Sequence, residues 1–133
     1  MIATALGAGV KRYVMDFLFR GVPGPSALWV GLTTVEPASD MSLAQLTELE
    51  PAGAEGYGRV AVPAGSWNGD GLRVSYDDVW FVNSGERAWP PVAGVFVATS
   101  QGGEGVVVSA ASLGGKRVLF PGDRWNQPVI FEI

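Results

Sequence analysis

The stretch that decides the fold is ALWVGLTT, residues Ala27–Thr34, in which large aliphatic residues occupy alternate positions. Leu28, Val30 and Leu32 share one face of an extended chain, because successive side chains of a strand point to opposite sides. Trp29 falls on the other face among smaller residues. This alternation predicts a strand with cover on both faces.

Further short β-rich runs follow this strand along the rest of the chain, at a spacing typical of all-β domains. They are Tyr57–Val62, Leu72–Tyr76, Val79–Val82, Val92–Thr99, Val106–Ala110, Arg117–Phe120 and Val129–Ile133. Turn-forming residues separate them, as in Asn68–Gly71, Gly114-Gly115 and Pro121–Asp123. The pattern predicts a mainly β fold, a single antiparallel β-sandwich or barrel of about eight strands.

Residues 1–20 are predicted to form an N-terminal α-helix, with Thr4 as its cap and Gly21 as its stop. Lys11 and its polar neighbours fall on another side from the apolar residues. The apolar residues at helical spacing are Leu6, Val10, Tyr13, Val14, Phe17 and Leu18. We expect this helix and the apolar C-terminal stretch 127–133 to pack on the β domain or on neighbouring copies.

A second, short helix is predicted in the loop 40–50. Ser42 and Gln45 form a capping-box pattern, and leucines follow at a spacing of three. No repeat or long polar linker divides the chain. Residues 1–133 are therefore predicted to be one domain, with the helix at 1–20 and the β-sandwich or barrel at 27–133.

Composition excludes several classes of function. Of 133 residues, 47% are apolar and 17% charged, which suits a buried core, and 19 Gly with 9 Pro indicate many turns. The net charge of −4 argues against binding to a nucleic-acid backbone. The chain has no His and no Cys, which removes serine–histidine and cysteine–histidine nucleophiles, zinc sites of those ligands and disulfides. Lys11 interrupts the early apolar stretch too soon for a signal peptide or membrane span, so we expect a cytoplasmic product without a membrane partner.

Two acidic patterns resemble functional sites but have simpler interpretations. Asp77 and Asp78 are adjacent, so in an extended chain their side chains diverge and do not share a proton. Residues 66–77 imitate a calcium loop, but Ser66 stands at its first position and Asp77 replaces the bidentate Glu at its last. Turns explain both patterns, and we predict no catalytic, cofactor-binding or metal-binding residue, hence no enzyme.

Five tryptophans are a high count for this length. Trp29 and Trp80 lie inside predicted strands and are expected in the core. The others adjoin turns and, with a proline pair, form a candidate partner interface. That candidate set is Trp67, Trp89, Pro90, Pro91 and Trp125. A loop folded back over the end of the domain explains the same residues equally well, and a sugar-binding platform is a third interpretation.

The order of motifs resembles that of a family of small tailed-bacteriophage virion proteins, described as head decoration, cement or tail-fibre-like proteins. The resemblance covers nearly the whole chain, although each motif is short. The matching segments are Leu28–Thr34 with Pro37, Gly56–Val62 with Trp67, Val92–Ala98 with Gly102-Gly103, Lys116–Val118 and Pro121–Asp123. Two segments depart from it, a longer insert at Asp40–Glu50 and a polar stretch at Asn83–Arg87.

This resemblance implies a non-enzymatic structural protein of the virion, made in the cytoplasm of a bacterial host. A capsid decoration or cement subunit would bind the outside of the assembled head, with itself and the major capsid protein as partners. Many weak, symmetric contacts would then add up to firm attachment. Two alternatives stay open, a tail-fibre or tail-tip protein that binds a tail protein, and a carbohydrate-binding β-sandwich module.

Overall fold

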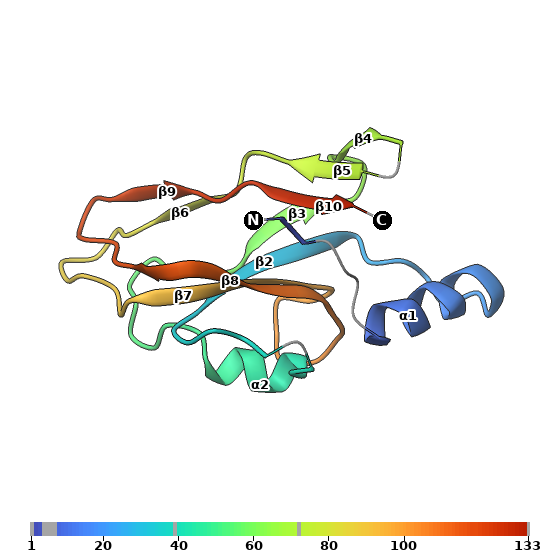
Figure 1. The fold of residues 1–133 in the computed structure, drawn as a ribbon, viewed down its shortest axis with the longest axis horizontal. Helices are drawn as coiled ribbons and strands as arrows, with labels where there is room; N and C mark the ends of the chain where they lie inside the picture. Colours follow the sequence, from blue (N-terminus) through green and yellow to red (C-terminus); the bar gives the residue numbers. More distant parts are fainter. Residues whose placement is uncertain (1, 4–7, 39, 72, 133) are drawn as a thin grey trace.

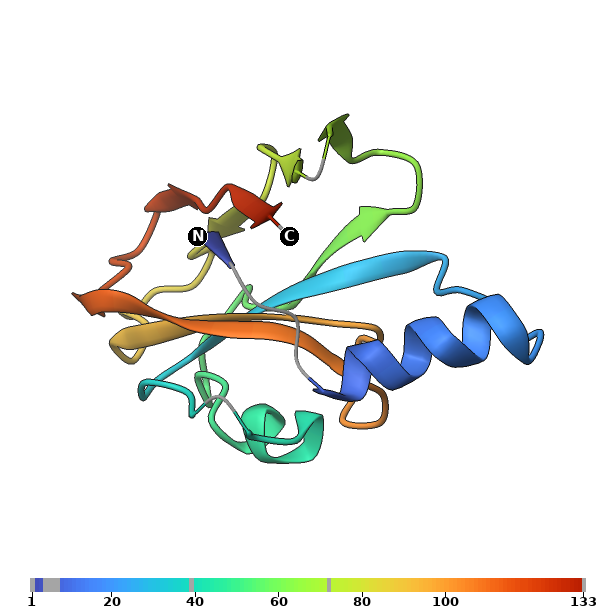
Figure 2. The same ribbon diagram turned by 45° about the vertical axis from the view of Figure 1, so that its right-hand side comes forward.

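The structure is a computed structural model that describes residues 2–3, 8–38, 40–71 and 73–132. Over these residues it contains ten strands and two helices. Two layers of strands lie one above the other, with one helix beneath the lower layer and the other at one end of the molecule (Figure 1, Figure 2). The sheets are open at their edges, so the fold is sandwich-like and not a closed barrel.

The central sheet has four strands in the order β3-β2-β7-β8, and every neighbouring pair is antiparallel. Its members are β2 (Ala27–Thr33), β3 (Val60–Pro63), β7 (Val92–Ala98) and β8 (Val107–Arg117). All seven residues of β7 are buried, because this strand is central and both of its faces are covered.

The outer sheet has the order β1-β10-β5-β4, and a two-stranded ribbon of β6 and β9 continues the same layer (Figure 1). The members of the outer sheet are β1 (Ile2–Ala3), β4 (Asn68–Asp70), β5 (Arg73–Tyr76) and β10 (Val129–Glu132). The ribbon comprises β6 (Trp80–Val82) and β9 (Arg124–Asn126). Strand β1 runs parallel to β10, so the first and the last strand of the chain lie side by side.

Helix α2 (Leu43–Glu48) begins with the predicted capping box. The Ser42 hydroxyl accepts the backbone N–H of Gln45, and the Gln45 side chain accepts the backbone N–H of Ser42. These bonds satisfy two N–H groups that have no partner inside the helix. Leu43 and Leu46 are buried and face the central sheet.

The central sheet separates two apolar cores. The larger lies between it and the outer layer and includes Val30, Leu32, Val95 and Val97. The smaller lies between the sheet and α2, where Phe96 and Ala98 meet Leu43 and Leu46. Alternate residues of β7 therefore feed different cores, as the period of two in a strand requires.

The sequence prediction of a mainly β fold with an N-terminal helix and a short helix near residues 43–48 is confirmed. Helix α1 (Ala8–Phe19) is shorter than the predicted 1–20, since Ile2–Ala3 pair with β10 as a strand. The predicted cap Thr4 lies outside the described residues. Strand β4 lies within the predicted turn 68–71, and β9 directly follows the predicted turn 121–123.

The predicted turn at Gly114-Gly115 is a bulge inside β8. In the pairing of β7 with β8, Val92 lies opposite Arg117 and Gly94 opposite Ser112, so β8 carries extra residues in between. Gly114 has φ of 77°, a backbone conformation that favours glycine. Strand β8 therefore continues from the first predicted strand, 106–110, through the predicted turn to Arg117, and residues 118–120 of the second predicted strand, 117–120, lie outside it.

Candidate functional site

Helix α1 carries more exposed apolar surface than a helix of a free-standing domain normally does. Of its described side chains, Val10 alone is buried. The exposed fraction is 56% for Met15 and 74% for Phe19, and Val14, Phe17 and Leu18 are exposed as well. Contiguous exposed apolar surface of this kind marks a site of contact with another molecule.

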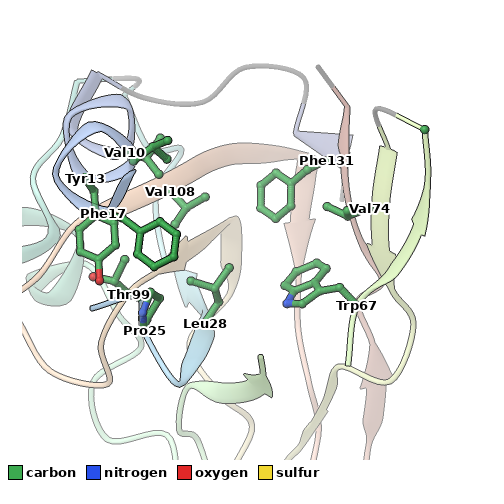
Figure 3. A pocket seen from close by; sticks show the side chains of 13 residues that line it. Val10, Tyr13, Phe17, Pro25, Leu28, Trp67, Val74, Thr99, Val108 and Phe131 are labelled. Carbon is green, nitrogen blue, oxygen red and sulfur yellow. The ribbon is translucent and has the colours of Figure 1, made fainter. Parts of the chain in front are cut away.

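An open groove runs between α1 and the strand layers (Figure 3). Its volume is about 590 Å³. One wall is formed by α1, the facing wall by the outer sheet and the turn before it, and the floor by the central sheet. The main lining residues are Val10, Tyr13 and Phe17 from α1, Trp67, Val74 and Phe131 from the facing wall, and Leu28 and Val108 from the floor.

The turn that follows α1 fixes the position of the helix beside the groove. Gly21 has φ of 70°, which ends the helix, and the hydroxyl of Tyr13 donates to the carbonyl oxygen of Pro23 at 2.8 Å. Gly24 lies against the Phe17 ring, because a Cβ at Gly24 would be 3.3 Å from a ring carbon. Asp16 and Arg20 form a solvent-accessible salt bridge of 3.3 Å, which contributes little to the stability of the helix.

The groove offers apolar contact and little polar chemistry. Among its lining residues none is charged. The Tyr13 hydroxyl donates to Pro23, and the Thr99 hydroxyl accepts the backbone N–H of Val106 at 2.9 Å. Such a surface is suited to apolar side chains from a partner.

A second cluster, of buried polar groups, lies around Arg59 on the other side of the central sheet. The Arg59 side chain is almost fully buried, and its Nη2 lies 2.6 Å from Oε1 of Glu50. Nη2 also donates to the Thr47 hydroxyl at 2.7 Å. Nη1 donates to the carbonyl oxygens of Ser100 at 3.0 Å and Gly102 at 2.6 Å. One side chain thus joins the end of α2 to the loop between β7 and β8.

Tyr57 completes this cluster. Its hydroxyl donates to Glu50 and accepts the backbone N–H of Leu32 at 3.0 Å. Burial raises the pKa of Tyr57 far above its ordinary value, and the hydrogen bond to the Glu50 carboxylate raises it further. The phenol therefore stays protonated. Because the polar groups of the cluster are paired with one another, its role is structural.

The chain matches no protein-family model, and none of the curated proteins matches it in sequence. Its function therefore has to be inferred from its motifs, contacts and surfaces. Among the described residues, neither helix is long and apolar enough to cross a membrane.

Two tryptophans of the candidate interface, Trp89 and Trp125, are buried core residues, as in the alternative interpretation of segments folded back onto the domain. Trp89 is 2% exposed; its Nε1 donates to the carbonyl oxygen of Glu55 at 2.9 Å, and its ring meets Tyr57 edge-on. Trp125 is buried against Phe81, and the guanidinium of Arg117 lies over its ring. Turn residues precede both, but the side chains point inward from β9 and from the segment before β7.

The other candidate interface residues lie nearer the surface. Pro90 is half-buried and Pro91 exposed. Trp67 is half-buried, packs on Tyr76 and Phe131, and lines the groove. The structure therefore does not bring the five candidates together in one patch, and Trp67 alone among them belongs to the groove.

The two tryptophans expected in the core are more exposed than predicted. Trp29 is half-buried. Trp80 is 43% exposed, because it lies on the outer face of the β6–β9 ribbon, and the guanidinium of Arg124 lies 4.9 Å from its ring centroid. The expectation of a core position is thus wrong for Trp80.

The acidic patterns form no cluster in the part of the chain that the structure describes. Asp77 and Asp78 are exposed after β5. Residues 68–70 and 73–76 pair as the hairpin β4–β5. Among the described residues, no three acidic side chains gather into a group that could hold a metal ion.

Sequence analysis missed the apolar side of α1 that faces away from the groove. Met15 and Phe19 follow Lys11 at steps of four, so the three share one stripe of the helix. The charge of Lys11 predicts a solvated stripe, but the second half of the stripe, Met15 and Phe19, is apolar. The signal that was available is the dense apolar run from Phe17 to Phe19.

Proposed function

We propose that this chain is a non-enzymatic structural subunit of a tailed-bacteriophage virion, which binds the outside of the assembled head as a decoration or cement protein. The observation that carries the proposal is the exposed apolar surface of α1 with its open groove. A surface of this kind needs a protein cover, as subunits of an assembly provide. The order of motifs along the chain supplies the link to virion proteins.

The contacts among three of these motifs support their structural use. Gly31 in β2 lies against Phe96 in β7, and Arg59 lies over the same ring with its Cζ 5.0 Å from the centroid. Segments 28–34, 56–62 and 92–98 therefore meet at one point of the central sheet. They build a scaffold that presents its loops and α1 outward, which is what a coat subunit requires.

Co-sedimentation with heads tests this proposal. The protein is mixed with heads of the phage that carries its gene, assembled without it, and the heads are pelleted. We expect saturable binding at a fixed ratio to the capsid subunit, because every equivalent site on a symmetric shell binds alike. Heads that already carry their full complement are the control and should take up none. Absence of binding to the undecorated heads would overturn the proposal.

The same assay with purified tails distinguishes the head from a tail-fibre or tail-tip position, since saturable binding to tails alone would move the protein there. A carbohydrate-binding module is the competitor from another class. Its best platform is the exposed ring of Trp80, but the Arg124 guanidinium lies over that ring. A glycan array on which the protein gives no signal, while heads bind it, excludes this alternative.

A further inference from the structure

Helix α1 is apolar on two opposite sides. The side that bears Val10, Tyr13 and Phe17 lines the groove. The other side bears Met15, Leu18 and Phe19, which we name the outer face, and all three are exposed. An apolar face of a helix is normally covered, either by the rest of its own chain or by a partner. In the single chain nothing described covers the outer face, and the groove is open.

We propose that the two surfaces are complementary: the outer face of α1 in one copy docks into the groove of a second copy. This inference rests on the proposed function as an assembling subunit and names the surface by which it self-associates. Both surfaces are apolar, and the space between the walls of the groove has a volume of about 590 Å³. Apolar side chains of a partner helix suit such a space.

The charges favour a second copy as the occupant. Residues 8–20 contain three basic residues and one acidic, a net of +2, whereas the rest of the chain contains six basic and twelve acidic, a net of −6. The helix is thus basic and the body that would receive it is acidic. Opposite net charge steers and orients such an encounter.

The two surfaces are different, so the contact is head-to-tail. Each copy provides one outer face and receives one in its groove. Such a contact closes into a ring when its rotation allows, and a ring can sit on a local symmetry axis of a shell. The competing arrangement is a two-fold contact in which two outer faces pack against each other and the grooves stay empty.

Complementary variants distinguish these arrangements. The outer-face variant carries Met15→Ser and Phe19→Ser, and the groove variant carries Val74→Arg, whose wild-type side chain is partly exposed. The matched control is Phe120→Ser, an exposed phenylalanine in the loop between β8 and β9, at the end of the molecule opposite α1 (Figure 1). Mass is measured by light scattering without heads, and circular dichroism checks that each variant folds.

We expect an oligomer for the wild type and for Phe120→Ser, and monomers of 14.0 kDa for the other two variants. Loss of the buried anchors should weaken association by about tenfold or more. An equimolar mixture of the outer-face and groove variants should form one-to-one pairs. Each pair would join the intact groove of the first to the intact outer face of the second, and it cannot grow further.

Three results would overturn the inference: a wild type that stays monomeric when concentrated, variants that keep the wild-type mass, or a mixture that does not pair. A groove variant that keeps the wild-type mass while the outer-face variant is monomeric would indicate the two-fold contact. These outcomes are independent of the head-binding assay. A monomer that binds heads would remove this interface and keep the proposed function, while an oligomer that ignores heads would do the reverse.

Discussion

Arg59 lies over the ring of Phe96, with its Cζ 5.0 Å from the ring centroid, and so joins the polar cluster to the core between the central sheet and α2. The guanidinium also forms the buried ion pair with Glu50. A cation over an aromatic face is attracted by the ring, and more strongly where water is excluded. The same residue therefore ties α2, the loop after β7 and the central sheet together.

Replacing Arg59 with Met should destabilise the fold by about 3–5 kcal/mol, because Glu50 would lose its ion-pair partner in a largely buried site. The free energy of unfolding from denaturant titration measures this loss. The control Arg87→Met alters an exposed arginine and should change stability by at most about 0.5 kcal/mol. Equal losses for the two variants would show that the cluster does not support the fold.

A methyl group at Gly31 should be costly because the Phe96 ring occupies its place. A Cβ at Gly31 would lie 2.7 Å from an ε carbon of that ring. We expect Gly31→Ala to destabilise by about 1–3 kcal/mol, as overpacked core positions do. In the double variant with Phe96→Leu the loss should be less than the sum of the two single losses.

Gly58→Ala provides the comparison for Gly31→Ala. No atom lies within 4 Å of a Cβ built at Gly58, so this substitution should be nearly neutral. Denaturant unfolding of the wild type, the two single variants at Gly31 and Phe96 and their double variant gives the coupling directly. Additive losses for Gly31→Ala and Phe96→Leu would contradict a direct contact between the two positions.

Stability should fall at high pH through Tyr57. Burial and the bond to Glu50 raise the pKa of Tyr57 above its ordinary 10.0, so the folded chain keeps a proton that the unfolded chain has lost. The stabilisation is complete below about pH 10 and decreases above it by about 1.4 kcal/mol per pH unit. Urea unfolding across this range should show the slope in the wild type and a smaller one in Tyr57→Phe.

At neutral pH, Tyr57→Phe should itself cost about 1–3 kcal/mol, because Glu50 and the Leu32 N–H lose a partner. Tyr13→Phe is the control, since it removes a hydroxyl that donates to Pro23 and leaves the Tyr57 hydroxyl in place. It should keep the wild-type slope. The same slope in Tyr57→Phe would assign the effect to other groups.

Local patterns account for the parts of the fold that sequence analysis predicted. The alternation in 27–34 and the capping box at Ser42 act within a few residues, and both β2 and α2 form as expected. Strand β1 has two residues, too few for a period to register, and depends on β10 from the other end of the chain. Pairing between distant segments leaves no trace in either segment alone.

The site was harder to predict for the same reason. Turns adjoin the candidate tryptophans, but a turn exposes its backbone and leaves the direction of neighbouring side chains to distant packing. Trp89 meets Glu55 and Tyr57, more than thirty positions earlier in the chain, and is therefore buried. The groove has the same origin, because its walls come from α1, the hairpin β4–β5 and β10.

The burial of Trp89 leads to a prediction that separates a core residue from an interface anchor. Trp89→Ala should destabilise by about 3–5 kcal/mol, because it removes a buried ring and its hydrogen bond to Glu55. Trp80→Ala removes a ring that is 43% exposed and should cost about 1 kcal/mol. Denaturant unfolding measures both losses. If Trp89 were an interface anchor, its substitution would weaken self-association and leave the unfolding of the monomeric outer-face variant unchanged; a large loss in that monomeric background identifies Trp89 as core.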